Sequence, residues 1–325
     1  MKKRVLITGA TGFVGYHLIQ AALASNLEVY INVRKSSVIS HLAGLAVNQV
    51  ELDFESIYQL KQNIEENKYH YIIHAAATTK AKNREEYFHT NATYTRNLAV
   101  ASTLSTHKIE KFEFLSSLAA RGPLKNDIDV NSSNPVTNYG RSKALAETYL
   151  NQILNLPLIV FRPTAVYGPR EKDIFILIKG INSGVELHAG KQEQQLSFIY
   201  VTDLAKVMIE ALASDVVNKT YNLSDGNVYS KFSLAAYVRK ALNKKPFVLE
   251  IPMPVIRGLA WTLEKTLGFF DKVPALNIDK VNEITAANWV CDIDKIQKDL
   301  GFVPKYQLET GLNETIAWYK ENKWL

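Results

Sequence analysis

The residues best suited to proton transfer in this sequence are Tyr139 and Lys143, in the segment NYGRSKALAETYL. The segment has helical character, and side chains four residues apart on a helix lie on the same face. A lysine ammonium beside a phenol stabilises the phenolate and lowers the tyrosine pKa from about 10 toward the working pH. The pair predicts an acid and base for catalysis, although this spacing alone more often marks an ordinary helix surface.

A glycine-rich turn follows the first hydrophobic run, RVLIT, which we expect to be a strand that ends at Thr8. Gly9, Gly12 and Gly15 have the GxxGxxG spacing at the start of a helix. The first allows a tight turn, the second lets a pyrophosphate approach backbone N–H groups, and the third lets helix and strand pack closely. The spacing predicts a dinucleotide site; the alternative is a glycine-rich turn that binds nothing.

The end of the second expected strand, INVRKSS, bears on the choice of dinucleotide. Arg34 and Lys35 stand where an acidic residue would accept hydrogen bonds from a ribose 2′-hydroxyl. Their positive charge suits a 2′-phosphate instead. The sequence therefore favours NADP over NAD, and the alternative is a surface Arg-Lys pair without a ligand.

Composition excludes several other classes of protein. The chain has 325 residues, 47% hydrophobic and 22% charged, which is ordinary for a globular protein. Its single cysteine, Cys291, allows no internal disulfide and lacks the usual zinc spacings, so we expect no metal and a reducing, cytoplasmic location. The net charge of +6 comes from scattered lysines, which argues against a nucleic-acid partner.

No membrane partner is expected either. The apolar run after MKKR is broken by Gly9 and Gly12 before it reaches the usual length of a signal peptide. The later apolar segment, residues 254–270, contains Arg257, Glu264 and Lys265 and falls short of a membrane span. We expect this segment to be a packed helix.

Short β-type runs alternate with helical stretches in the first half of the chain. Apolar strands separated by segments of helical length indicate crossover connections, which belong to a parallel sheet covered on both faces. The sequence predicts an α/β fold with a doubly wound parallel sheet of the Rossmann type. The expected strands are RVLIT, EVYINV, NQVEL, YIIHAA, KFEFLSS and LIVFRP, with TYNLSDG as a late strand that returns to the sheet.

The pattern changes after Pro163. A helix is expected near residues 173–179, and from about Asn227 the sequence is mainly helical with prolines between the segments. We expect a dinucleotide-binding domain of residues 1–164 and 201–226. A smaller, mainly helical substrate-binding domain would comprise residues 165–200 and 227–325.

A series of motifs carries a resemblance to a known family. The opening TGATGFVG resembles that of the extended short-chain dehydrogenase/reductase family, which comprises nicotinamide-dependent epimerases, dehydratases and reductases. Further motifs follow in the family's order along nearly the whole chain: HAAA, NATYTRNL, FLSS, YGRSK, RPTAVYGP and DLGFVP. The resemblance implies a Rossmann fold and a nicotinamide cofactor, with NADP favoured by the residues above and NAD possible.

The resemblance also implies roles for individual residues. Ser117, after the expected fifth strand, would donate a hydrogen bond to the substrate oxygen, and Ser116 is its competitor. Lys143 would bind the nicotinamide ribose in addition to assisting Tyr139. Asn91 matches an asparagine that supports the lysine in relatives, although an asparagine at a helix start is as often a cap.

Contacts with the dinucleotide follow from the same resemblance. Asp53 would lie at the adenine edge, although it also stands where a helix cap is expected. The implied cofactor-binding residues are Gly9, Thr11, Gly12, Phe13, Val14, Gly15, Arg34, Lys35, Asp53, Ala75, Ala76, Tyr139, Lys143 and Pro163.

Substrate-binding residues separate the branches of the family. Sugar-nucleotide members usually carry an arginine at the start of the strand that matches LSFIYVTD, and this chain has Leu196 there. They commonly use a second arginine in the C-terminal domain, but this chain has no arginine after Arg257. The segment SLAARG also lacks the acidic pair that dehydratases prefer. The resemblance is therefore to the reductase branch, similar to dihydroflavonol reductase and 3β-hydroxysteroid dehydrogenase, which implies a small apolar ketone or alcohol. Trp261, Phe269 and Phe270 are expected to line an apolar pocket or to form the core of the small domain.

Two other functions stay open. One is a nucleotide-sugar epimerase or dehydratase of the same family, which uses the same catalytic residues. The other is a non-catalytic dinucleotide sensor, but an intact set of Ser117, Tyr139 and Lys143 argues against it, because a pure binder needs no activated phenol. The expected partner is a small-molecule substrate, and a homodimer is compatible with the sequence.

Overall fold

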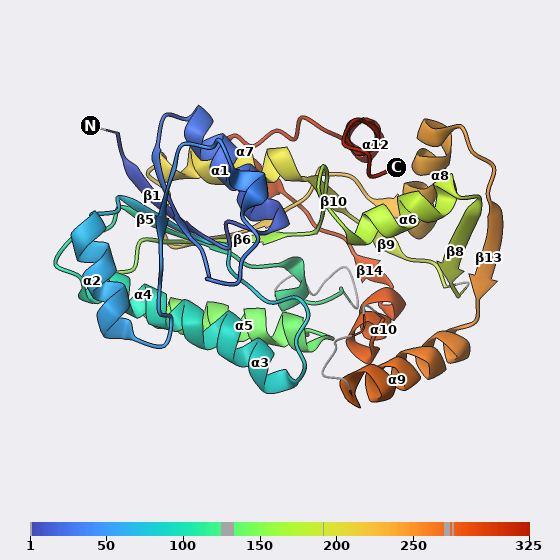
Figure 1. Cartoon of the computed structure of the whole chain (residues 1–325), viewed down its shortest axis with the longest axis horizontal. Helices are drawn as coiled ribbons and strands as arrows, with labels where there is room; N and C mark the ends of the chain where they lie inside the picture. Colours follow the sequence, from blue (N-terminus) through green and yellow to red (C-terminus); the bar gives the residue numbers. More distant parts are fainter. Residues whose placement is uncertain (1, 125–132, 191, 270–273, 275) are drawn as a thin grey trace.

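The computed structural model describes residues 2–124, 133–190, 192–269, 274 and 276–325. Its centre is a parallel seven-stranded sheet (Figure 1). The strand order β11-β6-β5-β4-β1-β2-β3 reverses between β1 and β4, and the predicted doubly wound sheet is confirmed. The strands are β1 (Arg4–Thr8), β2 (Glu28–Asn32), β3 (Val47–Val50), β4 (Tyr71–His74), β5 (Lys111–Leu115), β6 (Leu158–Pro163) and β11 (Lys219–Leu223).

Helices cover both faces of this sheet (Figure 1). The central strands β4 and β5 are buried along their whole length, as expected for parallel strands between two helical layers. One layer contains α1 (Phe13–Ala24) and α7 (Val201–Leu212), and the other contains α2 (Ile57–Asn67), α4 (Tyr94–Leu104) and α5 (Asn138–Asn151). Short turns connect them: η1 (Ser40–Leu42), α3 (Arg84–Phe88), the π-helical η2 (His89–Thr93) and η3 (Leu118–Ala120).

The second part of the chain extends to one side of the sheet (Figure 1). It is helical, as predicted, with α6 (Asp173–Asn182), α8 (Lys231–Leu242), α9 (Met253–Phe269), α10 (Ile278–Thr285), α11 (Asp294–Leu300) and α12 (Leu308–Glu321). It also contains small sheets that the sequence did not predict. Their strands are β7 (Ala165–Tyr167) with β10 (Phe198–Tyr200), β8 (Val185–Ala189) with β13 (Phe247–Ile251), and β9 (Gln195–Leu196) between β12 (Tyr229–Ser230) and β14 (Asn288–Trp289).

The two parts share a core. Ile296 of α11 is buried, together with Ile293 and Phe302, in the same cluster as the α1 and α7 face of the sheet. The Tyr221 hydroxyl of β11 donates to Asp299 Oδ2 of α11 at 2.8 Å. Residues 293–302, from the second part of the chain, therefore complete the first layer of helices.

Helix α9 differs from its sequence-based expectation. It is a helix, but its residue Trp261 is 59% exposed and belongs to none of the buried clusters of the described residues. The side chains of Phe269 and Phe270 lie outside the described residues. Among the helices that the structure describes, none has the length and apolar character needed to cross a membrane.

One buried acid interrupts the apolar core beneath the sheet. Glu113 lies in the middle of β5, between Ile73 and Ile159 on the neighbouring strands, and both of its carboxyl oxygens lack a hydrogen-bond partner among the described residues. Burial raises its pKa well above the usual value of 4.5, and the nearby Lys111 ammonium only partly opposes this shift. The folded protein therefore keeps a proton on Glu113 that the unfolded chain releases above that pH.

Glu113→Gln is expected to stabilise the fold at high pH. The proton retained by the folded state makes wild-type stability fall as pH rises above 4.5, whereas a neutral amide has no such dependence. In urea unfolding, the advantage of E113Q over wild type should grow by about 1.4 kcal/mol per pH unit until the folded-state pKa is passed. The control Glu66→Gln, at an exposed site on α2, should show no growing difference. If the difference in unfolding free energy between E113Q and wild type does not change with pH, Glu113 does not have a raised pKa in the folded protein.

Candidate functional site

The candidate site lies where helix α5 meets the end of β5. The Lys143 side chain is 1% exposed. Its Nζ donates to the Leu115 carbonyl at 2.7 Å and lies 4.4 Å from the centre of the Phe114 ring. Burial lowers the lysine pKa to about 7, and the negative charge of Glu147 opposes this shift.

Tyr139 lies four residues before Lys143 on the same helix and is partly buried. Burial raises its pKa to about 12, and a hydrogen bond with the Ser117 side chain opposes the rise. The prediction that Lys143 lowers the pKa of Tyr139 is therefore wrong for the protein without a bound ligand. The physical reason is that the Lys143 amine donates to a backbone carbonyl instead, while desolvation disfavours the phenolate.

The two serines after β5 have different surroundings. Ser116 Oγ donates to Glu147 Oε1 at 2.5 Å in a buried cluster, and the Arg162 guanidinium holds the same carboxylate. Ser117 Oγ instead accepts from the Ala119 N–H at 3.1 Å and faces the Tyr139 phenol. The structure therefore brings Ser117, and not Ser116, together with the tyrosine.

Asn91 lies in the π-helical turn η2 and is buried, so the alternative reading of it as a helix cap is wrong. Its Oδ1 accepts from the Thr78 N–H at 2.8 Å. Its Nδ2 donates to the Thr78 carbonyl and to Ser142 Oγ, each at 2.9 Å. Asn91 thus contacts α5 at the residue next to Lys143, and the π-helical turn directs it there.

The glycine turn has the predicted form. Gly9 has a φ of +70°, and a Cβ there would lie 2.6 Å from the Ala75 backbone. A Cβ on Gly15 would lie 2.1 Å from the Gly9 carbonyl oxygen, so these two glycines are required by packing. Gly12 caps α1 without a side-chain hydrogen bond, and the first turn of the helix has no acidic residue. The N–H groups of α1 are therefore available to an anion.

The other predicted cofactor residues gather at the same edge of the sheet. Thr11, Phe13 and Val14 lie in the turn and first residues of α1, Ala75 and Ala76 follow β4, and Pro163 ends β6. Arg34 and Lys35 follow β2 and are exposed. These carboxyl ends meet where a doubly wound sheet binds its ligand, so the residues present fit a dinucleotide.

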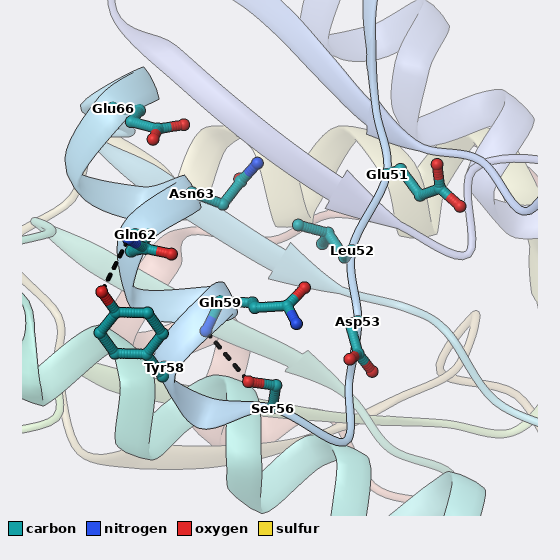
Figure 2. A pocket seen from close by; sticks show the side chains of 9 residues that line it. All are labelled: Glu51, Leu52, Asp53, Ser56, Tyr58, Gln59, Gln62, Asn63 and Glu66. Carbon is teal, nitrogen blue, oxygen red and sulfur yellow. Dashed lines mark hydrogen bonds between the residues drawn. The ribbon is translucent and has the colours of Figure 1, made fainter.

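Asp53 is not the cap of α2. Its Oδ1 accepts from the Glu55 N–H at 3.0 Å, while Ser56 caps the helix by accepting from the Gln59 N–H at 3.2 Å. Asp53 lines a polar hollow of about 470 Å³ between α2 and residues 51–53, and Figure 2 shows the side chains around it. Of the predicted site residues only Asp53 lines it, so this hollow is not where Tyr139 acts.

A buried chain of hydrogen bonds connects the glycine turn to Asn91, and the sequence reasoning missed it. The Thr95 hydroxyl donates to the Asn91 carbonyl at 2.7 Å, so it accepts from His74 Nε2 at 2.9 Å. His74 Nδ1 then accepts from the Thr8 hydroxyl at 2.8 Å, and that hydroxyl accepts from the Ala76 N–H. Burial lowers the His74 pKa to about 3, so the ring is neutral. The HAAA motif was the available signal.

No cluster of three His, Cys, Asp or Glu side chains that could hold a metal occurs in the described part of the chain. The site is built from a doubly wound sheet, an uncapped glycine turn and a tyrosine–lysine helix. These features define a dinucleotide-binding α/β enzyme. The chain belongs to the NAD dependent epimerase/dehydratase family, whose sequence pattern matches residues 5–224. The extended short-chain dehydrogenase/reductase resemblance is thereby confirmed.

Relatives within this family have different substrates. The dTDP-glucose 4,6-dehydratase of Neisseria gonorrhoeae is 25% identical, and the match covers 99% of this chain and 97% of the relative. Ceramide reductase of Caulobacter vibrioides is also 25% identical, with 99% and 96% covered. The structure of the Bordetella bronchiseptica enzyme WbmG in complex with NAD and UDP matches with a TM-score of 0.80 at 19% identity, covering 99% of this chain and 96% of that chain. This last likeness confirms the fold.

Gly12 and Gly15 should respond differently to substitution. In Gly15→Ala the new Cβ meets the Gly9 carbonyl oxygen at 2.1 Å, so we expect a loss of about 1–3 kcal/mol in unfolding free energy and no dinucleotide binding. In Gly12→Ala the nearest atom is 3.2 Å away and the φ of −80° suits alanine. This variant should keep its stability but bind NADP at least about tenfold more weakly, because its methyl group occupies the phosphate approach. Urea unfolding measures the stability of the two variants, and calorimetric titration measures their affinity for NADP. If G12A binds NADP as tightly as wild type does, the prediction that this turn holds the phosphate is wrong.

Proposed function

We propose that the protein is a nicotinamide-dependent oxidoreductase that interconverts a small apolar ketone and its alcohol, with Tyr139 as the acid and base. The supporting observation is that the Tyr139 phenol faces the Ser117 side chain and lies four residues before the buried Lys143 on α5. Residues 1–164 and 201–226 would bind the dinucleotide, and residues 165–200 and 227–325 would bind the substrate.

A bound nicotinamide supplies the hydride. In the reduction, the Tyr139 hydroxyl would give its proton to the carbonyl oxygen as the carbonyl carbon takes up the hydride that a bound nicotinamide would supply. Ser117 donates a second hydrogen bond to that oxygen and orients it. With a pKa of about 12 the phenol of the free protein is protonated at neutral pH and so has a proton to give, but this pKa lies above the working pH at which a general acid is most effective.

Lys143 and Asn91 position this acid. The Lys143 amine holds α5 against the end of β5 through the Leu115 carbonyl. Asn91 fixes Ser142 on the same helix. Both contacts are buried, so the orientation of Tyr139 does not depend on surface side chains.

The substrate side of the proposal rests on the missing arginines. Leu196 lies in β9, where it is paired with Tyr229 and Trp289, so apolar and aromatic residues occupy the place of a diphosphate clamp. Arg257 is exposed on α9. Ceramide reductase among the relatives is in keeping with an apolar substrate. The dehydratase relative and the UDP complex of WbmG support the second candidate, a nucleotide-sugar epimerase or dehydratase.

The cofactor side of the proposal rests on charge at the end of β2. Arg34 and Lys35 are exposed there, and the Lys35 ammonium lies 3.5 Å from Glu51 Oε1 in a solvated pair. Such an exposed pair is weak, so it leaves the lysine available to a 2′-phosphate. We propose NADP as the preferred cofactor.

Tyr139→Phe should lower turnover of apolar ketones at least about a hundredfold, because general acid catalysis is lost. Affinity for the dinucleotide should change little, since only the proton-transfer group is removed. Oxidation of reduced nicotinamide, followed by absorbance across a panel of ketones, measures the first, and calorimetric titration measures the second.

Two results would contradict the proposal. If Y139F keeps most of its activity, the tyrosine is not the acid. If the NADP-loaded protein binds UDP or dTDP with micromolar affinity, the nucleotide-sugar enzyme becomes the better account, because a protein without guanidinium clamps should hold a diphosphate poorly.

Arg34→Asp should reverse the preference between the two cofactors. Loss of one charge-assisted hydrogen bond, worth about 1.5–3 kcal/mol, weakens NADP binding about tenfold to a hundredfold. The new carboxylate can accept from a ribose 2′-hydroxyl, so NAD binding should improve. Lys206→Asp, the same charge change on an exposed residue of α7, is the control and should alter neither affinity. Wild-type protein that binds NAD as tightly as NADP would disprove the assignment.

A further inference from the structure

A second hollow, of about 540 Å³, lies at the edge of the seven-stranded sheet where its strands begin. Its lining residues are Lys2, Arg4, Glu28, Lys68, His70 and His107. Arg4 and Glu28 are the first residues of β1 and β2, and His70 directly precedes β4. The volume lies within the range of small-molecule sites, and none of the predicted site residues is part of the lining.

His70 has a hydrogen-bond donor that no described residue accepts. Its Nδ1 accepts from the Arg4 N–H at 3.0 Å. A neutral imidazole carries one proton, so the proton of His70 is on Nε2. Burial lowers the pKa of His70, which keeps the ring neutral at pH 7. The His107 ring stands edge-on to it and is fixed by its Nε2, which donates to the Tyr69 carbonyl at 2.8 Å. The Nε2–H of His70 is thus left for a ligand.

The acids at this hollow are already paired. Glu28 is the single acid of the lining. Its Oε2 accepts from Arg4 Nε at 3.1 Å, and its Oε1 accepts from the Tyr30 hydroxyl at 2.7 Å. Glu110, just outside the lining, forms an ion pair with Lys3 at 2.6 Å. Each carboxylate is therefore offset by a cation of its own.

Two ammonium groups of the lining have no such partner. Neither Lys2 nor Lys68 makes an ion pair with a described residue. Cations also collect at helix C-termini, where they favour the helix dipole, and Lys68 is the C-cap of α2. Arg4 already fills that role, because its Nη1 donates to the Asn67 carbonyl at 2.8 Å. The hollow therefore combines two unpaired positive charges with an imidazole donor.

We propose that this hollow binds a small anion that carries a phosphate group. A phosphate group offers up to two negative charges and three acceptor oxygens, which matches two ammonium groups and one N–H donor. A carboxylate has one charge and two oxygens, so it would leave one of these groups without a partner. A neutral ligand would leave both lysine charges unpaired.

This hollow is separate from the dinucleotide site. Strand β1 runs from Arg4 at the hollow to Thr8 beside the glycine turn, a distance of about 13 Å along a strand. The glycine turn and Tyr139 follow the ends of strands and lie at the other edge of the sheet. An anion bound in the hollow would therefore leave the dinucleotide in place, and the inference does not rest on the proposed function.

Calorimetric titration of the full-length protein with inorganic pyrophosphate tests the proposal. Saturating NADP blocks the glycine turn, which we expect to hold a pyrophosphate of its own, and salt at about 0.15 M screens exposed charges. Binding with a Kd below about 1 mM is expected. The double variant K2Q/K68N should weaken it at least about tenfold, and the binding that this variant loses is assigned to the hollow.

The control K320Q/K323N makes the same substitutions on exposed lysines at the end of α12, which lies away from the start of β1 (Figure 1). Lys323 matches Lys68 in its backbone, since their φ angles of 58° and 53° are both left-handed, a conformation that asparagine tolerates. This control should bind pyrophosphate as tightly as wild type. Equal losses in the two double variants would show attraction to net charge alone and overturn the site.

His70 gives a second readout, located in the hollow itself. In nitrogen NMR of histidine-labelled protein, the Nε2 signal of His70 should shift when pyrophosphate is added. The variant H70N identifies this signal, because asparagine retains an acceptor for the Arg4 N–H but has no ring nitrogen. The signals of His188, on β8 in the second part of the chain, should not respond. An unmoved His70 signal would place the anion elsewhere and overturn the proposal.

Three further results would contradict the phosphate site. Absence of binding at about 10 mM pyrophosphate would reject it outright. Succinate that binds as tightly as pyrophosphate would show that a carboxylate suffices, so the class of ligand would be wrong. A single-stranded oligonucleotide that binds more tightly than pyrophosphate would assign the lysines to a nucleic acid. None of these results bears on the proposed oxidoreductase, because ketone turnover is measured separately.

Discussion

The hydrogen bond from the buried Lys143 amine to the Leu115 carbonyl determines how helix α5 meets the sheet. Because the amine lies among apolar side chains, moving it away from that carbonyl would leave a buried polar group without a partner. The approach is close enough that Gly140 has no space for a side chain, since a Cβ there would lie 2.3 Å from the Ala119 carbonyl oxygen. Tyr139 therefore faces Ser117 as a consequence of backbone packing.

The second part of the chain helps to hold this arrangement. Asp279 accepts from the first N–H of α5, and the Arg121 guanidinium after η3 donates to the Val290 carbonyl at 3.4 Å. The two segments next to the catalytic residues are thus tied to the part of the chain that we propose to bind substrate. Any movement of α10 on substrate binding would be transmitted to Tyr139 through the hydrogen bond between Asp279 and the Asn138 N–H.

The sequence predicted the features that depend on local pattern. The strands, the glycine turn and the tyrosine–lysine spacing are short-range, and all of them are present in the structure. The pairing of β8 with β13 joins segments far apart in the chain, and short exposed strands of this kind have no periodic signal. Asp53 and Ser56 both suit a helix cap, and only the backbone shows that Ser56 is used. The raised pKa of Tyr139 comes from burial, which residue spacing does not encode.

The π-helical turn at residues 89–93 has a consequence for how this region tolerates changes of length. A π-helical turn holds one residue more than the α-helical turn it replaces. Removing one residue would restore an ordinary α-helical turn, so α3 and α4 would keep their orientations while the side chains within the turn would change theirs. Asn91, within the turn, would then lose its contacts with Thr78 and Ser142, whereas Thr95, in α4, could keep its bond to His74. The segment therefore accepts substitution at its exposed positions but not a change in the number of its residues.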